Sequence, residues 1–168
     1  MRPEEASDFV RDGGEGTLSM EALVELLKAV LGNGRPFRVR ATGISMSPFI
    51  KDSDIITISP LLPGGLQIGD VAAFMQSKTG KLVVHRVVGI KKDAYIMRGD
   101  NTLESDGLIP ASCVLGYITR AEREGRQVSL RSRPERIIIA HLSYRGLLMP
   151  FLILMHKLFH PVIRRLKT

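Results

Sequence analysis

Two β-forming runs, Val71 to Gln76 (VAAFMQ) and Leu82 to Ile90 (LVVHRVVGI), stand on either side of the turn-forming sequence Lys78-Thr79-Gly80. Runs of apolar and β-branched residues separated by a short glycine-containing turn are typical of a β-hairpin. The sequence therefore predicts two paired antiparallel strands here. Such a hairpin would hold His85, in the second run, at a fixed place in a sheet, as a catalytic base requires.

Further short β-type segments flank the predicted hairpin along the chain. They run from Phe37 to Thr42, from Asp54 to Ser59, from Ala94 to Met97 and from Val114 to Arg120. Six short strands with tight connections indicate a mainly β domain, built as a coiled sheet or in a barrel-like form.

A helix is predicted ahead of the strands, between Leu18 and Leu31. Ser19 can cap its first turn, and Gly32-Asn33-Gly34 provides a stop signal. The apolar residues that recur at helical spacing are Leu23, Leu26, Leu27, Val30 and Leu31. This amphipathic helix is expected to cover one side of the core, with contact to a partner as the alternative.

Changes in composition divide the chain into four predicted segments. These are an acidic, glycine-rich and mobile N-terminus at 1–17, the amphipathic helix at 18–34, the β-rich domain at 35–124 and a basic, apolar helical tail at 125–168. Within the tail, helix is expected from Glu135 to about Phe159, broken or kinked at Pro150 and Pro161.

The composition excludes several classes of protein. The formal charge of +7 lies in the tail, because residues 1–119 carry 13 Lys and Arg against 14 Asp and Glu, whereas residues 120–168 carry 11 against 3. The tail arginines are mixed with long aliphatic residues, and the chain has no tryptophan, so no nucleic-acid partner is expected. The single cysteine, Cys113, argues against a disulfide framework or a multi-cysteine metal site. No metal or cofactor is expected.

Neither an export signal nor a spanning helix is expected. The start is acidic rather than basic and then apolar, and no window holds the roughly 18 apolar residues that a membrane span requires. The tail at 135–168 pairs apolar residues with flanking cations, which favours peripheral membrane contact; the alternatives are packing on the β domain and a partner-binding surface. The expected location is the cytoplasm or the cytoplasmic face of a membrane.

Serine, histidine and aspartate occur in an order that is compatible with hydrolase chemistry. Ser45 lies in the turn sequence Gly43 to Pro48 (GISMSP), His85 in a predicted strand, and Asp100 and Asp106 in and after a turn. A serine becomes nucleophilic when a histidine accepts its proton and a carboxylate orients that histidine. Taken singly, each residue also fits a structural role as a turn, core or capping residue.

Four short motifs in one order resemble the signal peptidase I family of serine endopeptidases. They are 43–48 (GISMSP), 68–71 (IGDV), 84–88 (VHRVV) and 99–101 (GDN). The histidine is similar to that of the archaeal and endoplasmic-reticulum branch, whereas the common bacterial branch and the self-cleaving SOS-response repressors carry lysine there. The resemblance covers Phe37 to Arg120, about half of the chain.

The resemblance implies a catalytic serine peptidase domain at 35–124. Ser45 would be the nucleophile, His85 the general base and Asp106 the acid, with Asp100 as the alternative or supporting carboxylate. The substrate-binding candidates, which are equally compatible with core positions, are Ile44, Met46 and Phe49.

The expected function is cleavage of an extended precursor or leader peptide through an acyl-enzyme intermediate, with small side chains before the cut. The alternatives are a peptide-binding module with weakened turnover and a self-cleaving regulatory protease of the SOS-repressor type, for which Lys81 is the nearest base. Two features depart from the family pattern. Gly43 stands where many members have a hydroxyl residue, and an acidic segment with an amphipathic helix replaces the usual N-terminal membrane anchor.

Overall fold

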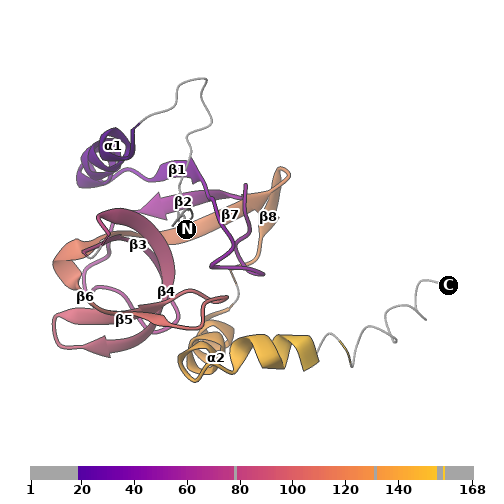
Figure 1. Cartoon of the computed structure of the whole chain (residues 1–168). Helices are drawn as coiled ribbons and strands as arrows, with labels where there is room; N and C mark the ends of the chain where they lie inside the picture. The colour runs from indigo at the N-terminus through magenta and orange to yellow at the C-terminus, as the bar shows by residue number, and fades with distance from the viewer. Residues whose placement is uncertain (1–18, 78, 131, 155–156, 158–168) are drawn as a thin grey trace, which may run out of the picture.

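The computed structural model describes residues 19–77, 79–130, 132–154 and 157. Its centre is one antiparallel sheet of eight strands with α-helix before and after it (Figure 1). The mainly β fold with flanking helices is therefore confirmed. The predicted mobile segment at 1–17 lies outside the described residues.

The strands form an open sheet in the order β1-β2-β7-β3-β4-β5-β6, and β8 pairs with β7 outside this path. Their bounds are β1 Phe37–Arg40, β2 Ile55–Ser59, β3 Val71–Gln76, β4 Lys81–Lys91, β5 Ala94–Arg98, β6 Ser105–Pro110, β7 Val114–Arg123 and β8 Arg126–Val128. A short 3-10 turn, Ala111–Cys113, leads into β7. The central position of β3 and β4 makes their hairpin the frame of the site.

The predicted hairpin forms, and its second strand is longer than its first. β3 and β4 pair in register from Val71 opposite Arg86 to Gln76 opposite Lys81. On its other side β4 pairs with β5 only from Arg86 onward, where Arg86 faces Arg98. Among the described residues, no strand pairs with residues 81–85 of β4 on the side where β5 lies. The backbone N–H and C=O groups on that side are therefore open to pair with a further strand.

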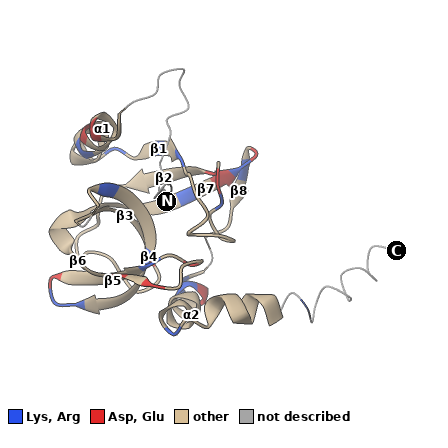
Figure 2. Cartoon of the chain, in the orientation of Figure 1, with Lys and Arg blue, Asp and Glu red and all other residues tan. Residues whose placement is uncertain are grey.

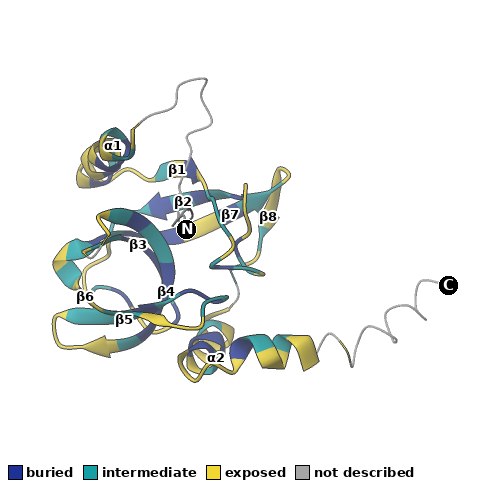
Figure 3. Ribbon diagram, in the orientation of Figure 1, coloured by how far each residue is buried: buried dark blue, intermediate teal, exposed yellow. Residues whose placement is uncertain are grey.

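Buried residues follow the strands of the sheet (Figure 3), and they form two apolar clusters. One cluster lies under helix α1, Met20–Gly32, and includes Leu27 and Ile56; the other includes Phe74 and Met97. The hydroxyl of Ser19 accepts the backbone N–H of Ala22 at 3.2 Å, which confirms the predicted N-cap. The helix covers the core with most of the apolar residues that were predicted at helical spacing.

Two strands were absent from the sequence prediction, β6 and β8. The sequence of β6, SDGLIP, contains glycine and proline, which have low β-propensity. It is an edge strand that pairs with β5 from Ala94 opposite Pro110 to Arg98 opposite Ser105. Pairing with a neighbour, rather than local propensity, therefore makes this segment a strand, and it brings Asp106 into the sheet.

The C-terminal helical region breaks earlier than predicted. Helix α2 spans Arg133–Tyr144, and a second helix from 148 to 154 follows at a bend of 112°. The break lies at Gly146, whose φ of 70° interrupts the helix, so the prediction of a break at Pro150 is wrong. Pro150 lies in the first turn of the second helix, where a backbone N–H has no helical partner, and Pro161 lies outside the described residues.

Apolar side chains on these two helices and in the bend between them remain exposed. They are Ile137, Ile138, Tyr144, Leu147, Phe151, Ile153 and Leu154 (Figure 3). Within the described part of the chain no single helix has the length and composition of a membrane span; only the bent pair taken together meets both measures. Over the sheet, basic and acidic residues occur at scattered positions (Figure 2).

Candidate active site

Ser45 lies in a compact loop between β1 and β2. Its turn is closed by backbone hydrogen bonds from Ser47 to Ile44 and from Ile50 to Met46, both 3.0 Å long. Gly43 has a φ of 92° and donates its N–H to the Asp52 carboxylate at 2.9 Å. A residue with a β-carbon is strained at this φ, so the loop favours glycine at position 43.

The Gly-Asp-Asn sequence between β5 and β6 holds the Ser45 turn in place. The backbone N–H of Asn101 donates to the Ser45 carbonyl oxygen at 2.7 Å, and the Asn101 side-chain amide donates to the Ile44 carbonyl oxygen at 3.3 Å. A β-carbon added to Gly99 would lie 2.8 Å from the Ser45 carbonyl oxygen and 2.9 Å from His85 Nε2. Ser45 and His85 thus converge on Gly99, which leaves no room for a side chain.

Asp106 orients His85 and is itself held by a second hydrogen bond. His85 Nδ1 lies 2.6 Å from Asp106 Oδ2, and both side chains are at least nine-tenths buried. The second oxygen of Asp106 accepts the Gln76 side-chain amide at 3.0 Å, and the Thr79 hydroxyl donates to Gln76 Oε1 at 2.7 Å. Because Nδ1 contacts the carboxylate, Nε2 is the other ring nitrogen of His85, and it lies on the side of Gly99.

Gln76 and Thr79 were missed as functional residues by the sequence analysis. One signal pointed to Gln76, since it is the only polar residue in an otherwise apolar run. Thr79 lies in the hairpin turn, where threonine is too common to stand out.

Asp100 has a different partner. Its two carboxylate oxygens accept hydrogen bonds from Arg86 Nε and Nη2 at 2.8 and 2.7 Å, and both side chains are almost fully buried. Arg86 also donates to the Gly69 carbonyl oxygen at 2.8 Å and lies 5.5 Å from the ring centroid of Phe49. Successive side chains of a strand point to opposite faces, so His85 and its neighbour Arg86 reach different aspartates.

A cavity of about 270 Å³ is lined by Ser45, His85 and Asp106 together. Of the three predicted substrate-binding residues, Met46 lines this cavity; Ile44 is 67% exposed and Phe49 packs under Arg86, and neither contributes to the lining. The cavity is otherwise mainly apolar, as small-substrate pockets are.

The Ser45 hydroxyl makes no hydrogen bond with any described residue, His85 included. Serine and histidine groups often approach to hydrogen-bond distance only when a substrate is bound. The backbone N–H of Ser45 is likewise unengaged by the described residues. The cavity therefore offers a nucleophile, an oriented imidazole and a backbone donor in one place.

The described residues contain no group of three or more histidine, cysteine, aspartate and glutamate side chains arranged to hold a metal ion.

Comparison with known proteins gives one family-level result. No protein-family model matches the chain. A curated relative, Signal peptidase I U of Bacillus subtilis (strain 168), is 27% identical over 93 residues, which are 54% of this chain and 49% of the relative. The chain thus spans about half the length of that relative. The similarity supports a relationship to the signal peptidase I family and, at that level, a peptidase-type function.

Proposed function

We propose that this chain is a serine endopeptidase of the signal-peptidase type that uses a Ser-His-Asp triad. The observation that carries the proposal is the 2.6 Å contact of His85 Nδ1 with Asp106 Oδ2 beside a cavity that Ser45 also lines. The histidine at the position of the base supports the archaeal and endoplasmic-reticulum branch of the family, within this proposal, over the lysine-dependent one. Family-level similarity to a named signal peptidase supports the peptidase-type function in this proposal.

In the proposed reaction, Ser45 Oγ attacks the carbonyl carbon of the scissile peptide bond while His85 Nε2 accepts its proton. The C–N bond then breaks, His85 returns the proton to the departing amine, and the acyl group stays on Ser45 as an ester. A water molecule next attacks this ester with His85 again as the base, which releases the acid and restores Ser45. Asp106 accepts the Nδ1–H hydrogen bond and stabilises the imidazolium that forms.

The oxyanion of the tetrahedral intermediate is proposed to bind backbone N–H groups, that of Ser45 among them. The Gly43 N–H is already engaged by Asp52, and Gly43 has no hydroxyl to contribute. Loss of one oxyanion donor typically lowers the rate about 100-fold or more. The proposal therefore implies slower turnover than in relatives that have the hydroxyl.

The substrate is proposed to be an extended precursor or leader peptide. The open edge of β4 from Lys81 to His85 ends at the proposed base, so a peptide strand paired there would pass the Ser45 hydroxyl. Backbone pairing gives affinity, and pockets for alternate side chains give selectivity. Met46, which lines the cavity, is the candidate for contact with a small side chain before the cut.

A self-cleaving or regulatory protease with a lysine base is the second candidate, because Lys81 lines the same cavity as Ser45. The two candidates differ in the effect of Lys81→Ala. We expect this variant to keep cleaving a library of precursor peptides, because the proposed base is His85. Mass spectrometry of the products checks the result. If Lys81→Ala abolished cleavage and His85→Ala did not, lysine would be the base and the proposed triad would be wrong.

We also propose that the C-terminal helices contact a membrane surface. Phe151 and Leu154 are exposed apolar residues on a short helix, and the exposed cations Arg145 and Lys157 flank it. Apolar side chains that enter the interface beside cations at the headgroups are typical of peripheral helices. The surface is too short to act as an independent span by itself.

Flotation with vesicles that contain phosphatidylserine tests this contact. The full chain is expected to float with the vesicles, and a Phe151→Ser, Leu154→Ser double variant to bind roughly tenfold less, since two apolar side chains no longer leave water. Leu62→Ser, an exposed apolar residue of the β2–β3 connection, is the matched control. Equal flotation of all three proteins would reject the interfacial role.

A further inference from the structure

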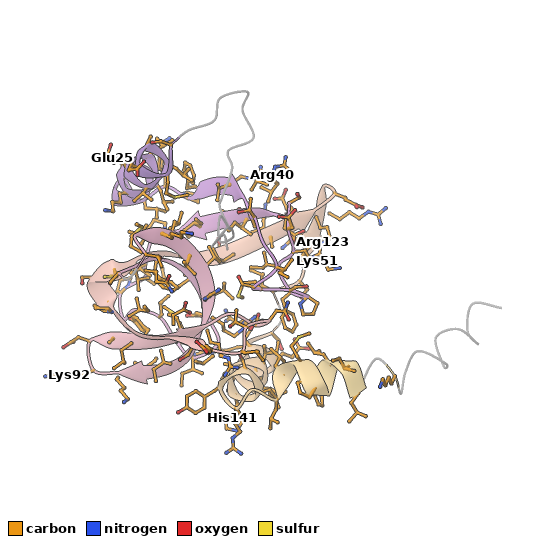
Figure 4. All side chains as sticks on the ribbon, in the orientation of Figure 1. Glu25, Arg40, Lys51, Lys92, Arg123 and His141 are labelled. Atoms are coloured by element: carbon orange, nitrogen blue, oxygen red, sulfur yellow. The ribbon has the colours of Figure 1, made fainter. Side chains whose placement is uncertain are left out.

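Two lysines from different parts of the chain line the cavity that contains Ser45 and His85. Lys51 belongs to the loop ahead of β2, and Lys81 is the first residue of β4 (Figure 4 labels Lys51). The rest of the lining is mainly apolar or hydroxylated and includes Met46 and Thr42. Two cations in a partly enclosed, largely apolar cavity attract anions more strongly than they would in open water.

The cavity lining holds more lysines than acidic side chains. Among the described residues that line the cavity, Asp106 is the only acidic one. Its Oδ2 is held by His85 at 2.6 Å and its Oδ1 by Gln76 at 3.0 Å. The lining therefore carries two lysines against one carboxylate, and that carboxylate is hydrogen-bonded to the imidazole that it orients.

Neither acidic residue near Lys51 in sequence forms an ion pair with its ammonium group, although Asp54 Oδ2 accepts the Lys51 backbone N–H at 2.8 Å. Asp52 accepts the N–H of Gly43 at 2.9 Å and the Ser53 hydroxyl at 3.1 Å. Asp54 is buried and accepts two hydrogen bonds of 2.8 Å from Arg123, and these raise the pKa of the arginine. The ammonium group of Lys51 forms no ion pair with any described residue and is exposed at the cavity.

Lys81 and His85 lie on the same face of β4, because side chains alternate along a strand and the two residues are four apart. At about 3.3 Å per residue, their backbones are separated by roughly 13 Å along the strand. A peptide in extended conformation on the open edge of β4 that reaches His85 with its scissile bond would pass Lys81 about four residues away from that bond.

We infer that this cavity selects peptides that carry an aspartate or glutamate a few residues from the scissile bond, and that Lys51 and Lys81 bind that carboxylate. This inference rests on the proposed function and names its substrate class. The same lysines disfavour peptides with lysine or arginine at those positions, so the selection has an attractive and a repulsive part.

The test uses quenched fluorogenic dodecapeptides with alanine at alternate positions and a single Asp or Asn moved through the remaining ones. At one or two positions, the wild-type full chain is expected to cleave the Asp peptide about fivefold faster in kcat/KM than the Asn peptide, the size of a good partly exposed ion pair. The preference is expected to weaken from 50 to 500 mM salt, because salt screens exposed charges.

Lysine variants identify the source of the preference. Lys51→Met and Lys81→Met are expected to reduce the Asp-over-Asn ratio toward one, whereas Lys28→Met, which removes an exposed lysine of α1 that is not part of the cavity lining, leaves it unchanged. A ratio of one at every position in the wild-type chain, or a ratio unchanged in both cavity variants, overturns the inference and leaves the peptidase proposal intact.

Binding to the Ser45→Ala chain gives a readout that does not require turnover. Fluorescence anisotropy of labelled Asp and Asn peptides is expected to show the same roughly fivefold preference. If no peptide is cleaved by the wild-type chain but the preference in binding is present and depends on the two lysines, the charge selection stands and the peptidase function fails. Equal binding of both peptides overturns the charge selection.

Discussion

Replacing Ser45 with alanine is expected to lower kcat for peptide cleavage by about 10⁴-fold to 10⁶-fold, because the variant lacks the attacking hydroxyl of the proposed mechanism. The fold should persist, since the Ser45 side chain forms no hydrogen bond with a described residue and its backbone carbonyl still accepts the Asn101 N–H. Cleavage of fluorogenic peptides measures the loss, and thermal unfolding of the same sample verifies that the variant is folded.

Covalent labelling gives an independent measurement of the same residue. A fluorophosphonate is expected to modify the wild-type chain at Ser45, as located by mass spectrometry, and to leave Ser45→Ala unmodified. Ser47→Ala, a serine of the same turn, is the matched control and should label normally. Undiminished cleavage by both Ser45→Ala and His85→Ala would remove the proposed mechanism, whereas peptide binding without labelling of the wild-type chain would favour a binding module.

Replacing Asp100 with asparagine is expected to lower the free energy of unfolding by about 3–5 kcal/mol, the usual effect of breaking a buried ion pair. Arg86 would keep its charge inside the protein without the two carboxylate oxygens that now accept its N–H groups at 2.8 and 2.7 Å. Urea unfolding of the purified variant measures the change. Asp93→Asn, an exposed aspartate in the β4–β5 turn, is the control and should change stability by less than about 0.5 kcal/mol.

A double variant separates the loss of the Arg86–Asp100 ion pair from the loss of unfolding free energy caused by leaving Arg86 buried, charged and unpaired. Arg86→Met combined with Asp100→Leu is expected to recover much of the stability, because no unpaired charge remains buried. If Asp100→Asn were as stable as the wild-type chain but inactive, the assignment of Asp100 to a structural role would be wrong. Asp100 would then be a member of the catalytic machinery instead of Asp106.

Most of the fold could be predicted from local sequence, because helix-capping, turn and strand-forming preferences act over a few residues. The hairpin of β3 and β4, the helix capped by Ser19 and the nucleophile turn each follow from short-range preferences of backbone and side chain. β6 could not be predicted in this way, since its glycine and proline disfavour a strand and its pairing with β5 comes from the tertiary fold.

The sequence by itself determined which residue types are present for serine-hydrolase chemistry: one turn serine, one strand histidine and two aspartates downstream. Only the tertiary structure decided which aspartate meets the histidine, and that Gln76 and Asn101 hold the parts together. The physical reason is register. His85 and Arg86 are adjacent but point to opposite faces of β4. The pairing of β4 with β5 and of β5 with β6 brings Asp106 to the face of His85 and Asp100 to the face of Arg86. No local preference of the backbone or side chains encodes which aspartate reaches which face.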